Sequence, residues 1–212
     1  MVNLINFRKS ILRSFGLFRP IRAIGNIEIL YHHHPVKIIV GKHSYGRIHV
    51  YSYQPGGTIR IGNYCSMSEI SVIMGGNHNK GITTYPFKTR FLKESPSHDN
   101  LSIKGIEIES DSWIGLNVTI LDGVKISVGT IVGAGAVVAR TTDPYGIYVG
   151  NPARKIGARF DENKIQQLLD SKWWEFSKEN LISLVDKLYS TDVTIFLEAL
   201  REVREEETNG NQ

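Results

Sequence analysis

The chain has 212 residues, of which 41% are hydrophobic and 22% charged, a composition that fits one main globular domain with an appendage. Its formal net charge of +4 is spread along the sequence, which argues against a nucleic-acid groove and favours a small anionic ligand or substrate. A single cysteine excludes an internal disulfide and fits a reducing cytoplasm. No apolar run approaches the roughly 20 residues that span a bilayer, and the N-terminus lacks the apolar core of a signal peptide.

Residues 1–24 carry apolar side chains at helical spacing, with Arg8, Lys9 and Arg13 between them. The pattern predicts an amphipathic segment with two interpretations. In the first, the segment is a helix that packs on the rest of its own chain or on a neighbouring subunit. In the second, it is a basic helix that makes a peripheral contact with an anionic membrane surface.

The most regular feature of the chain is a six-residue repeat. Large aliphatic residues recur at Ile108, Ile114, Ile120, Ile126, Val132 and Val138. The positions four further on are all small or β-branched: Ser112, Val118, Val124, Thr130, Ala136 and Thr142. Neither a helix nor a flat strand gives a period of six, whereas hexapeptide repeats are typical of a parallel β-helix. Earlier hexads have Ile61, Met67 and Ile73 as large members, with Cys65 and Ser71 in the small slots. We predict a β-helix domain over residues 25–155.

The repeat is interrupted once. Ile73 and Ile108 are 35 residues apart, one short of a multiple of six, and the segment between them is rich in Gly, Asn, His, Pro and Ser. We predict a loop over residues 75–105 that protrudes from the coil, because long loops in compact domains are commonly functional.

The coil is expected to end at Asn151-Pro152, since proline cannot donate to a strand ladder. Asp161 and Ser177 are predicted N-caps of two helices, and a third helix is expected to start near Asp192. C-terminal helices are thus predicted over residues 156–205, with a disordered tail at 206–212.

Several motifs, in order, resemble one family. They are Ile61-Gly-Asn-Tyr-Cys-Ser-Met67, Gly76-Asn-His-Asn79, Thr84-Tyr-Pro-Phe87, Ser112-Trp-Ile-Gly115, Gly150-Asn-Pro-Ala153 and Lys172-Trp-Trp174. Together they are similar to the hexapeptide-repeat xenobiotic acetyltransferases, which include chloramphenicol and streptogramin acetyltransferases, over about residues 59–190.

The resemblance implies a mainly β, left-handed parallel β-helix that forms homotrimers with acetyl-CoA sites between subunits. It also implies a loop histidine as general base, and the matching residue is His78. A histidine near neutral pKa suits this task. Asn77 or Asn79 would orient it, and His98 is an alternative base in the same loop. A purely structural role for His78 is the remaining alternative. We expect Tyr85, Met67 and His98 to contact the acceptor.

The same resemblance assigns the coenzyme to the later coils. The pantetheine arm would run near Trp113, Gly133, Ala134 and the exit at Asn151 and Pro152, and the basic pair Arg154 and Lys155 would meet the phosphates of CoA. The alternative is that Trp113 is packing and that the basic pair is a solvated face. No metal is expected, because the adjacent His32, His33 and His34 of a strand point to opposite faces.

The sequence before Ile59 does not resemble that of the drug-modifying members. We therefore interpret the chain as a cytoplasmic, acetyl-CoA-dependent O-acetyltransferase acting on a hydroxyl of a sugar or polysaccharide precursor. An antibiotic hydroxyl is the second candidate acceptor, and a catalytically silent trimeric scaffold is the alternative of another class.

Overall fold

The computed structural model describes residues 21–76, 78, 80–95 and 102–209 of the chain. They fall into two compact units, one ending at Gly157 and the other beginning at Ala158. The expected amphipathic segment lies outside the described residues except for its last four. These four form strand β1, Ile21–Ile24, which pairs antiparallel with β2, so the segment ends earlier than expected.

The first unit is a β-solenoid, as the six-residue repeat predicts. Its longer strands in the N-terminal half are β2 (Asn26–His33), β3 (Lys37–Val40), β4 (Tyr45–Ser52), β5 (Thr58–Ile61) and β6 (Ser66–Met74). The shorter strands that follow are β7 (Ile106–Ile108), β8 (Trp113–Ile114), β9 (Thr119–Leu121), β10 (Lys125–Ile126), β11 (Ile131–Val132), β12 (Val137–Val138), β13 (Gly146–Val149) and β14 (Arg154–Ala158).

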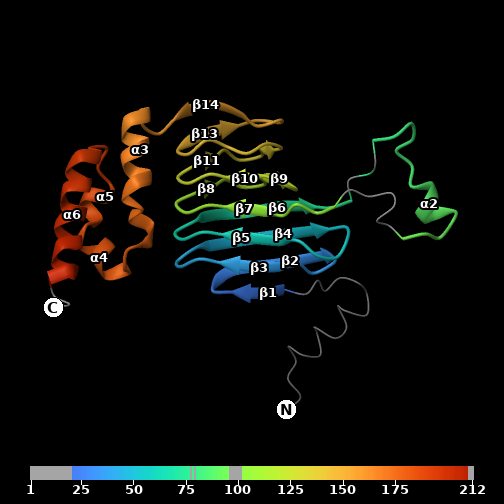
Figure 1. The fold of residues 1–212 in the computed structure, drawn as a ribbon, viewed down its shortest axis with the longest axis horizontal. Helices are drawn as coiled ribbons and strands as arrows, with labels where there is room; N and C mark the ends of the chain where they lie inside the picture. Colours follow the sequence, from blue (N-terminus) through green and yellow to red (C-terminus); the bar gives the residue numbers. More distant parts are fainter. Residues whose placement is uncertain (1–20, 77, 79, 96–101, 210–212) are drawn as a thin grey trace, which may run out of the picture. The chain divides into compact units, whose positions relative to one another are not determined.

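Successive coils from β2 to β13 stack by parallel pairing, and β14 lies beside β13 at the end of the first ladder. One ladder runs β2-β4-β6-β8-β11-β13-β14, a second runs β3-β5-β7-β10, and β9 joins β6 to β12 (Figure 1). The solenoid continues one strand beyond the expected end at Asn151-Pro152. Strand β14 follows Pro152, lies at the edge of the sheet, and has every residue exposed. The proline lies in the connection between β13 and β14, where the ladder needs no N–H from it.

The interior is built as the hexads predict. All six large residues are buried, from Ile108 at 0% exposed to Val138 at 1%. The small slots are filled in the same way, since Ala136 and Thr130 are also at 0%. Each fully buried aliphatic side chain contributes roughly 1.5–3 kcal/mol relative to exposure, so this column is the main source of stability.

The corners explain why the period is six. Gly105, Asp111, Asn117, Gly123, Gly129 and Gly135 all have positive φ, between +57° and +91°. The left-handed region is open to Gly and tolerated by Asn and Asp, so one such residue per hexad turns the chain. At Gly129 the requirement is also steric, because a Cβ there would lie 2.5 Å from the ring of Tyr145.

One part of the predicted register is wrong. Met67 is interior, but Ser71 and Ile73 are half-buried and face outward, while Val72 and Met74 are buried instead. The shift arises at a bulge between β4 and β6, where the pairing slips between Tyr45 and Arg47. A one-residue slip in a strand reverses the face of every following side chain.

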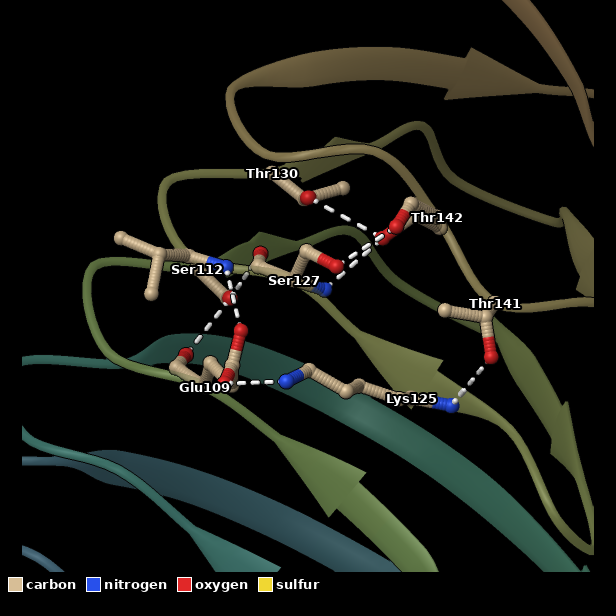
Figure 2. Close-up of polar contacts among 8 residues, drawn as sticks. Glu109, Ser112, Lys125, Ser127, Thr130, Thr141 and Thr142 are labelled. Carbon is tan, nitrogen blue, oxygen red and sulfur yellow. Dashed lines mark hydrogen bonds and ion pairs between the residues drawn. The ribbon is translucent and has the colours of Figure 1, made fainter. Parts of the chain in front are cut away.

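Polar residues in the small slots are satisfied by hydrogen bonds across the coils, as Figure 2 shows. The backbone N–H of Ser127 donates to Thr142 Oγ1 at 2.8 Å, and Thr142 Oγ1 lies 3.1 Å from Thr130 Oγ1. Ser112 Oγ donates to the carbonyl of Glu109 at 2.7 Å. A buried polar group that keeps its partner avoids the desolvation cost of a lone one, so this ladder is compatible with the core.

The second unit is helical. It contains α3 (Glu162–Ser171), the 3-10 helix η2 (Trp173–Glu175), α4 (Lys178–Ser183), α5 (Val185–Leu188) and α6 (Val193–Asn209). The predicted caps are confirmed, because Asp161 accepts from the N–H of Lys164 and Ser177 from that of Asn180. The expected disordered tail is wrong in part, since α6 continues to Asn209. Glutamate is a strong helix former, which favours this extension.

Among the helices of the described residues, none has the length and apolarity to cross a membrane.

Candidate active site

The loop between β6 and β7 carries the predicted base. This segment leaves the coil after Met74, contains the short helix α2 (Phe87–Arg90), and returns at β7. His78 is exposed on it. Its predicted supports Asn77 and Asn79, and the alternative base His98, lie outside the described residues, so their roles stay predictions.

His78 is held by the backbone of its own loop. Its Nδ1 lies 2.5 Å from the carbonyl oxygen of Thr84. A carbonyl only accepts hydrogen bonds, so the neutral imidazole has its proton on Nδ1 and a lone pair on Nε2. That tautomer offers a base on the side away from Thr84. Thr84 begins one of the motifs in the sequence, but the motif gives no sign of this role, because the contact uses the backbone of Thr84 and not its side chain.

Tyr85 is next to this carbonyl and stays a candidate acceptor contact. Its ring is 49% exposed and meets Phe87 edge-on, with 5.0 Å between the ring centroids. Phe91 is 64% exposed and lies 5.5 Å from Phe87. The three rings form an exposed apolar surface beside the base. The prediction for Met67 is wrong, since its side chain is 2% exposed and packs in the solenoid core, where an acceptor cannot reach it.

The predicted coenzyme residues come together at one corner of the solenoid. Trp113 on β8 is 56% exposed and pairs with Ile131 of the next coil. The N–H of Gly133 donates to Tyr148 at 2.8 Å, and that of Val137 donates to Gly150 at 3.0 Å. In the layer below, the N–H of Gly135 donates to Leu116 at 2.8 Å, so the β8-to-β9 corner, the Gly133-Ala134 turn and the Asn151-Pro152 turn stack on successive layers. Ala134 is exposed on this corner.

The two basic residues after this corner, Arg154 and Lys155, differ in whether their side chains are already paired with an acidic group. Lys155 Nζ forms an ion pair with Asp143 Oδ2 at 2.8 Å, and this contact lowers the pKa of the Asp143 carboxyl. Arg154 donates from Nη1 to the backbone oxygen of Ala153 at 3.1 Å and is exposed. A surface pair of this kind contributes at most about 1 kcal/mol, so Lys155 can exchange Asp143 for another anion.

The base and the coenzyme corner lie at different corners of one solenoid. The loop interrupts the β6-to-β7 corner. The second half of β6 pairs with β9, and β7 pairs with β10, so this corner stacks on the β9-to-β10 corner of the next coil. Trp113 and Ala134 lie instead at the β8-to-β9 corner and the layer above it. One chain therefore presents the two halves of the predicted site on separate edges.

Within the described ranges, no group of three or more His, Cys, Asp or Glu side chains is arranged to hold a metal ion. His32 has other contacts, because its ring stacks on Tyr51 at 4.1 Å and its Nε2 lies 3.3 Å from Nδ1 of His49.

Comparisons with known proteins give one consistent class. No family model matches the chain. A probable macrolide acetyltransferase of Lysinibacillus sphaericus is 42% identical over 142 residues, covering 64% of this chain and 79% of that protein. A chloramphenicol acetyltransferase of Agrobacterium fabrum is 33% identical over 177 residues, covering 74% and 84%. The virginiamycin A acetyltransferase of Staphylococcus aureus is 37% identical over 148 residues, covering 65% and 68%. Among solved structures, a hexapeptide-repeat acetyltransferase of Vibrio cholerae with acetyl-CoA has 25% identity and a TM-score of 0.46, covering 63% of this chain and 72% of that one.

Proposed function

The chain belongs to the acetyltransferase family that includes the chloramphenicol and virginiamycin A acetyltransferases, and from that membership we propose that it is an acetyl-CoA-dependent O-acetyltransferase with His78 as general base. The observation that carries the assignment of the base is the contact between His78 Nδ1 and the carbonyl of Thr84. It leaves Nε2 free to accept a proton, which is what acetyl transfer to a hydroxyl requires.

In this mechanism Nε2 of His78 takes the proton of the acceptor hydroxyl as the hydroxyl oxygen bonds to the thioester carbonyl carbon. The carbonyl of Thr84 accepts from Nδ1–H throughout and stabilises the imidazolium that forms. When the carbon–sulfur bond breaks, the imidazolium returns the proton to the sulfur. The products are an acetyl ester and the free thiol of CoA. A positioned base of this kind contributes about 100-fold or more to the rate.

We propose that the working unit is a homotrimer with each site between two subunits. Support comes from the separation of the loop corner from the corner bearing Trp113 and Ala134. A loop of one copy that meets the coenzyme corner of the next completes the site. Mixing His78→Ala with Trp113→Ala subunits tests this, because only a shared site regains activity in mixed trimers. Mixed assemblies without regained activity would place each site within one chain.

The acceptor has two candidates, each with its own support. The relatives named for macrolides, chloramphenicol and virginiamycin A favour an antibiotic hydroxyl. The exposed rings of Tyr85, Phe87 and Phe91 beside the base offer such a molecule an apolar surface. A sugar or polysaccharide-precursor hydroxyl is favoured instead by a charged groove at the base of the loop, lined by Arg60, Lys104 and Glu107.

The test is release of the CoA thiol from acetyl-CoA with a panel of macrolide, chloramphenicol, streptogramin and phosphorylated and free sugar acceptors. We expect turnover with one class and its loss in His78→Ala. Absence of thiol release with every acceptor, in a protein that binds acetyl-CoA, would support the silent scaffold. Placement in the cytoplasm and membrane contact through residues 1–24 remain predictions.

A further inference from the structure

A charged groove lies at the corner where the loop leaves and rejoins the solenoid. It encloses about 420 Å³, and its lining includes the charged side chains of Arg60, Lys104, Glu107 and Lys125. Three glycines on successive layers, Gly57, Gly105 and Gly123, line it as well, and the stem of the Lys104 side chain passes over Gly123. The layers are held in register, because the N–H of Gly123 donates to the carbonyl of Gly105 at 2.8 Å.

The charges of this groove are only partly neutralised. Lys125 Nζ is paired with Glu109 at 2.6 Å. The carboxylate of Asp122 accepts from the backbone N–H groups of Lys104 and Gly105 and is thus turned toward the backbone. Within the part of the chain that the structure describes, the side chains of Arg60 and Lys104 form no ion pair. Two exposed cations therefore face an open groove.

Glu107 lies between the cations and adds a different chemistry. In the ladder it is opposite Arg60 on one side and Lys125 on the other, yet no ion pair joins it to either. A carboxylate in this position accepts hydrogen bonds from hydroxyl groups. An arginine and a lysine beside it donate to phosphate oxygens, and arginine does so with two parallel bonds. The combination suits a phosphate ester that also carries free hydroxyls.

The groove adjoins the base of the loop that holds His78. A Cβ on Gly57 would lie 2.5 Å from Ile103 and 2.8 Å from Met74, the residues beside the two ends of the loop. A Cβ on Gly75 would lie 3.0 Å from the same Ile103. His78 is three positions after Gly75 in the sequence, so their Cα atoms are at most about 11 Å apart. A ligand held in the groove is therefore within the range of the catalytic loop.

We propose that this groove is a binding site for a phosphorylated sugar, with Arg60 and Lys104 holding the phosphate and Glu107 accepting from a hydroxyl. The claim that the groove binds a sugar phosphate stands on its own. The claim that this binding serves the reaction rests on the proposed acetyl transfer. Two sources share this chemistry. One is the ribose phosphate of CoA, and the other is a phosphorylated sugar acceptor.

Calorimetric titration of the full chain with inorganic pyrophosphate tests the binding site without catalysis. We expect saturable binding to the wild type, weakened at least about tenfold in Arg60→Ala and in Lys104→Ala. Arg22→Ala is the matched control, because Arg22 is exposed on β1 and does not line the groove. Glu107→Gln should tighten binding, because it removes a like charge beside the phosphate. Thermal midpoints of all variants must match the wild type.

No binding to the wild type at millimolar pyrophosphate would overturn the proposal, and so would equal weakening in Arg22→Ala or weaker binding in Glu107→Gln. The source is then assigned by kinetics. Arg60→Ala raises the KM for acetyl-CoA if the phosphate belongs to the donor, and the KM for a sugar phosphate if it belongs to the acceptor. Pyrophosphate binding in a protein without transferase activity would refute the proposed function and leave the site standing.

Discussion

The Nδ1 atom of His78 and the carbonyl oxygen of Thr84, six positions later in the same loop, lie 2.5 Å apart. This contact orients the imidazole by a hydrogen bond to a backbone carbonyl, so the orientation does not depend on which side chain residue 84 carries. Among the described residues, the partner that positions the proposed base is thus a backbone carbonyl.

We predict that His78→Ala lowers kcat by at least about 100-fold while acetyl-CoA binding survives, because the variant removes the proton acceptor and leaves the coenzyme corner intact. The measurement is steady-state thiol release at saturating acetyl-CoA, with coenzyme binding followed by calorimetry. His98→Ala is the comparison variant in the same loop. Equal turnover in His78→Ala and wild type would falsify the assignment, and a loss confined to His98→Ala would move the role to that residue.

Ala136 tests the small slot of the hexad. It is 0% exposed, so Ala136→Leu should overpack the coil and lower the free energy of unfolding by roughly 1–3 kcal/mol. Ala136→Asp should cost more, because it buries a charge without a partner. Arg140, which is exposed, should tolerate alanine within about 0.5 kcal/mol. Denaturant midpoints at fixed protein concentration give the comparison. Wild-type stability in Ala136→Asp would mean that this side chain does not face the interior.

The hexad interior was predictable because every slot repeats the same environment, as Ile108 and Ala136 illustrate. The inward direction of Met74 and Val72 was not, because the bulge opposite Tyr45 and Arg47 changes the register without a signal in the period. Of the site, the sequence indicated His78 through its motif. It could not indicate the Thr84 carbonyl or the groove at Arg60 and Lys104, since both depend on residues brought together by the stacking of coils.

Thr142 and Thr141 form a matched pair for the polar ladder drawn in Figure 2. Thr142 is 3% exposed, and its Oγ1 accepts from the N–H of Ser127 at 2.8 Å. Thr142→Val keeps the shape and leaves that buried N–H unpaired, which should cost about 1–3 kcal/mol of stability. Thr141 is exposed and lies 3.4 Å from the N–H of Lys125, so Thr141→Val should cost well under 1 kcal/mol. Equal unfolding midpoints for the two variants would contradict the role of the ladder.

Cys65 should be unreactive in the folded protein. Burial raises the pKa of its thiol to about 11, so at pH 8 almost none is thiolate. We expect an aromatic disulfide reagent to label the native chain at least ~100-fold more slowly than the urea-unfolded chain, whose thiol has a pKa near about 8.5. Because the unfolded chain ionises first, native stability should fall as pH rises above about 8.5. Equal labelling rates in the two states would show that the Cys65 slot is open.

The N-terminal segment should be dispensable for assembly. A chain that begins at Ile21 keeps β1 and the whole solenoid, and we expect light scattering to give three times the monomer mass. The full chain at the same concentration is the control. A monomeric mass for the shortened chain alone would make residues 1–20 an assembly element, and a monomeric mass for both would refute the trimer.

Strands β5 and β7 pair residue for residue, Ile61 with Ile108, although both β6 and the loop lie between them in the sequence. The loop between β6 and β7 leaves and rejoins the solenoid at a single corner, where Ile103 and Met74 both lie beside Gly57. Residues can therefore be added to or removed from its outer part without shifting any coil. Changes in the loop that carries the proposed base are thus uncoupled from the folding of the solenoid, so acceptor preference could be altered there at little cost in stability.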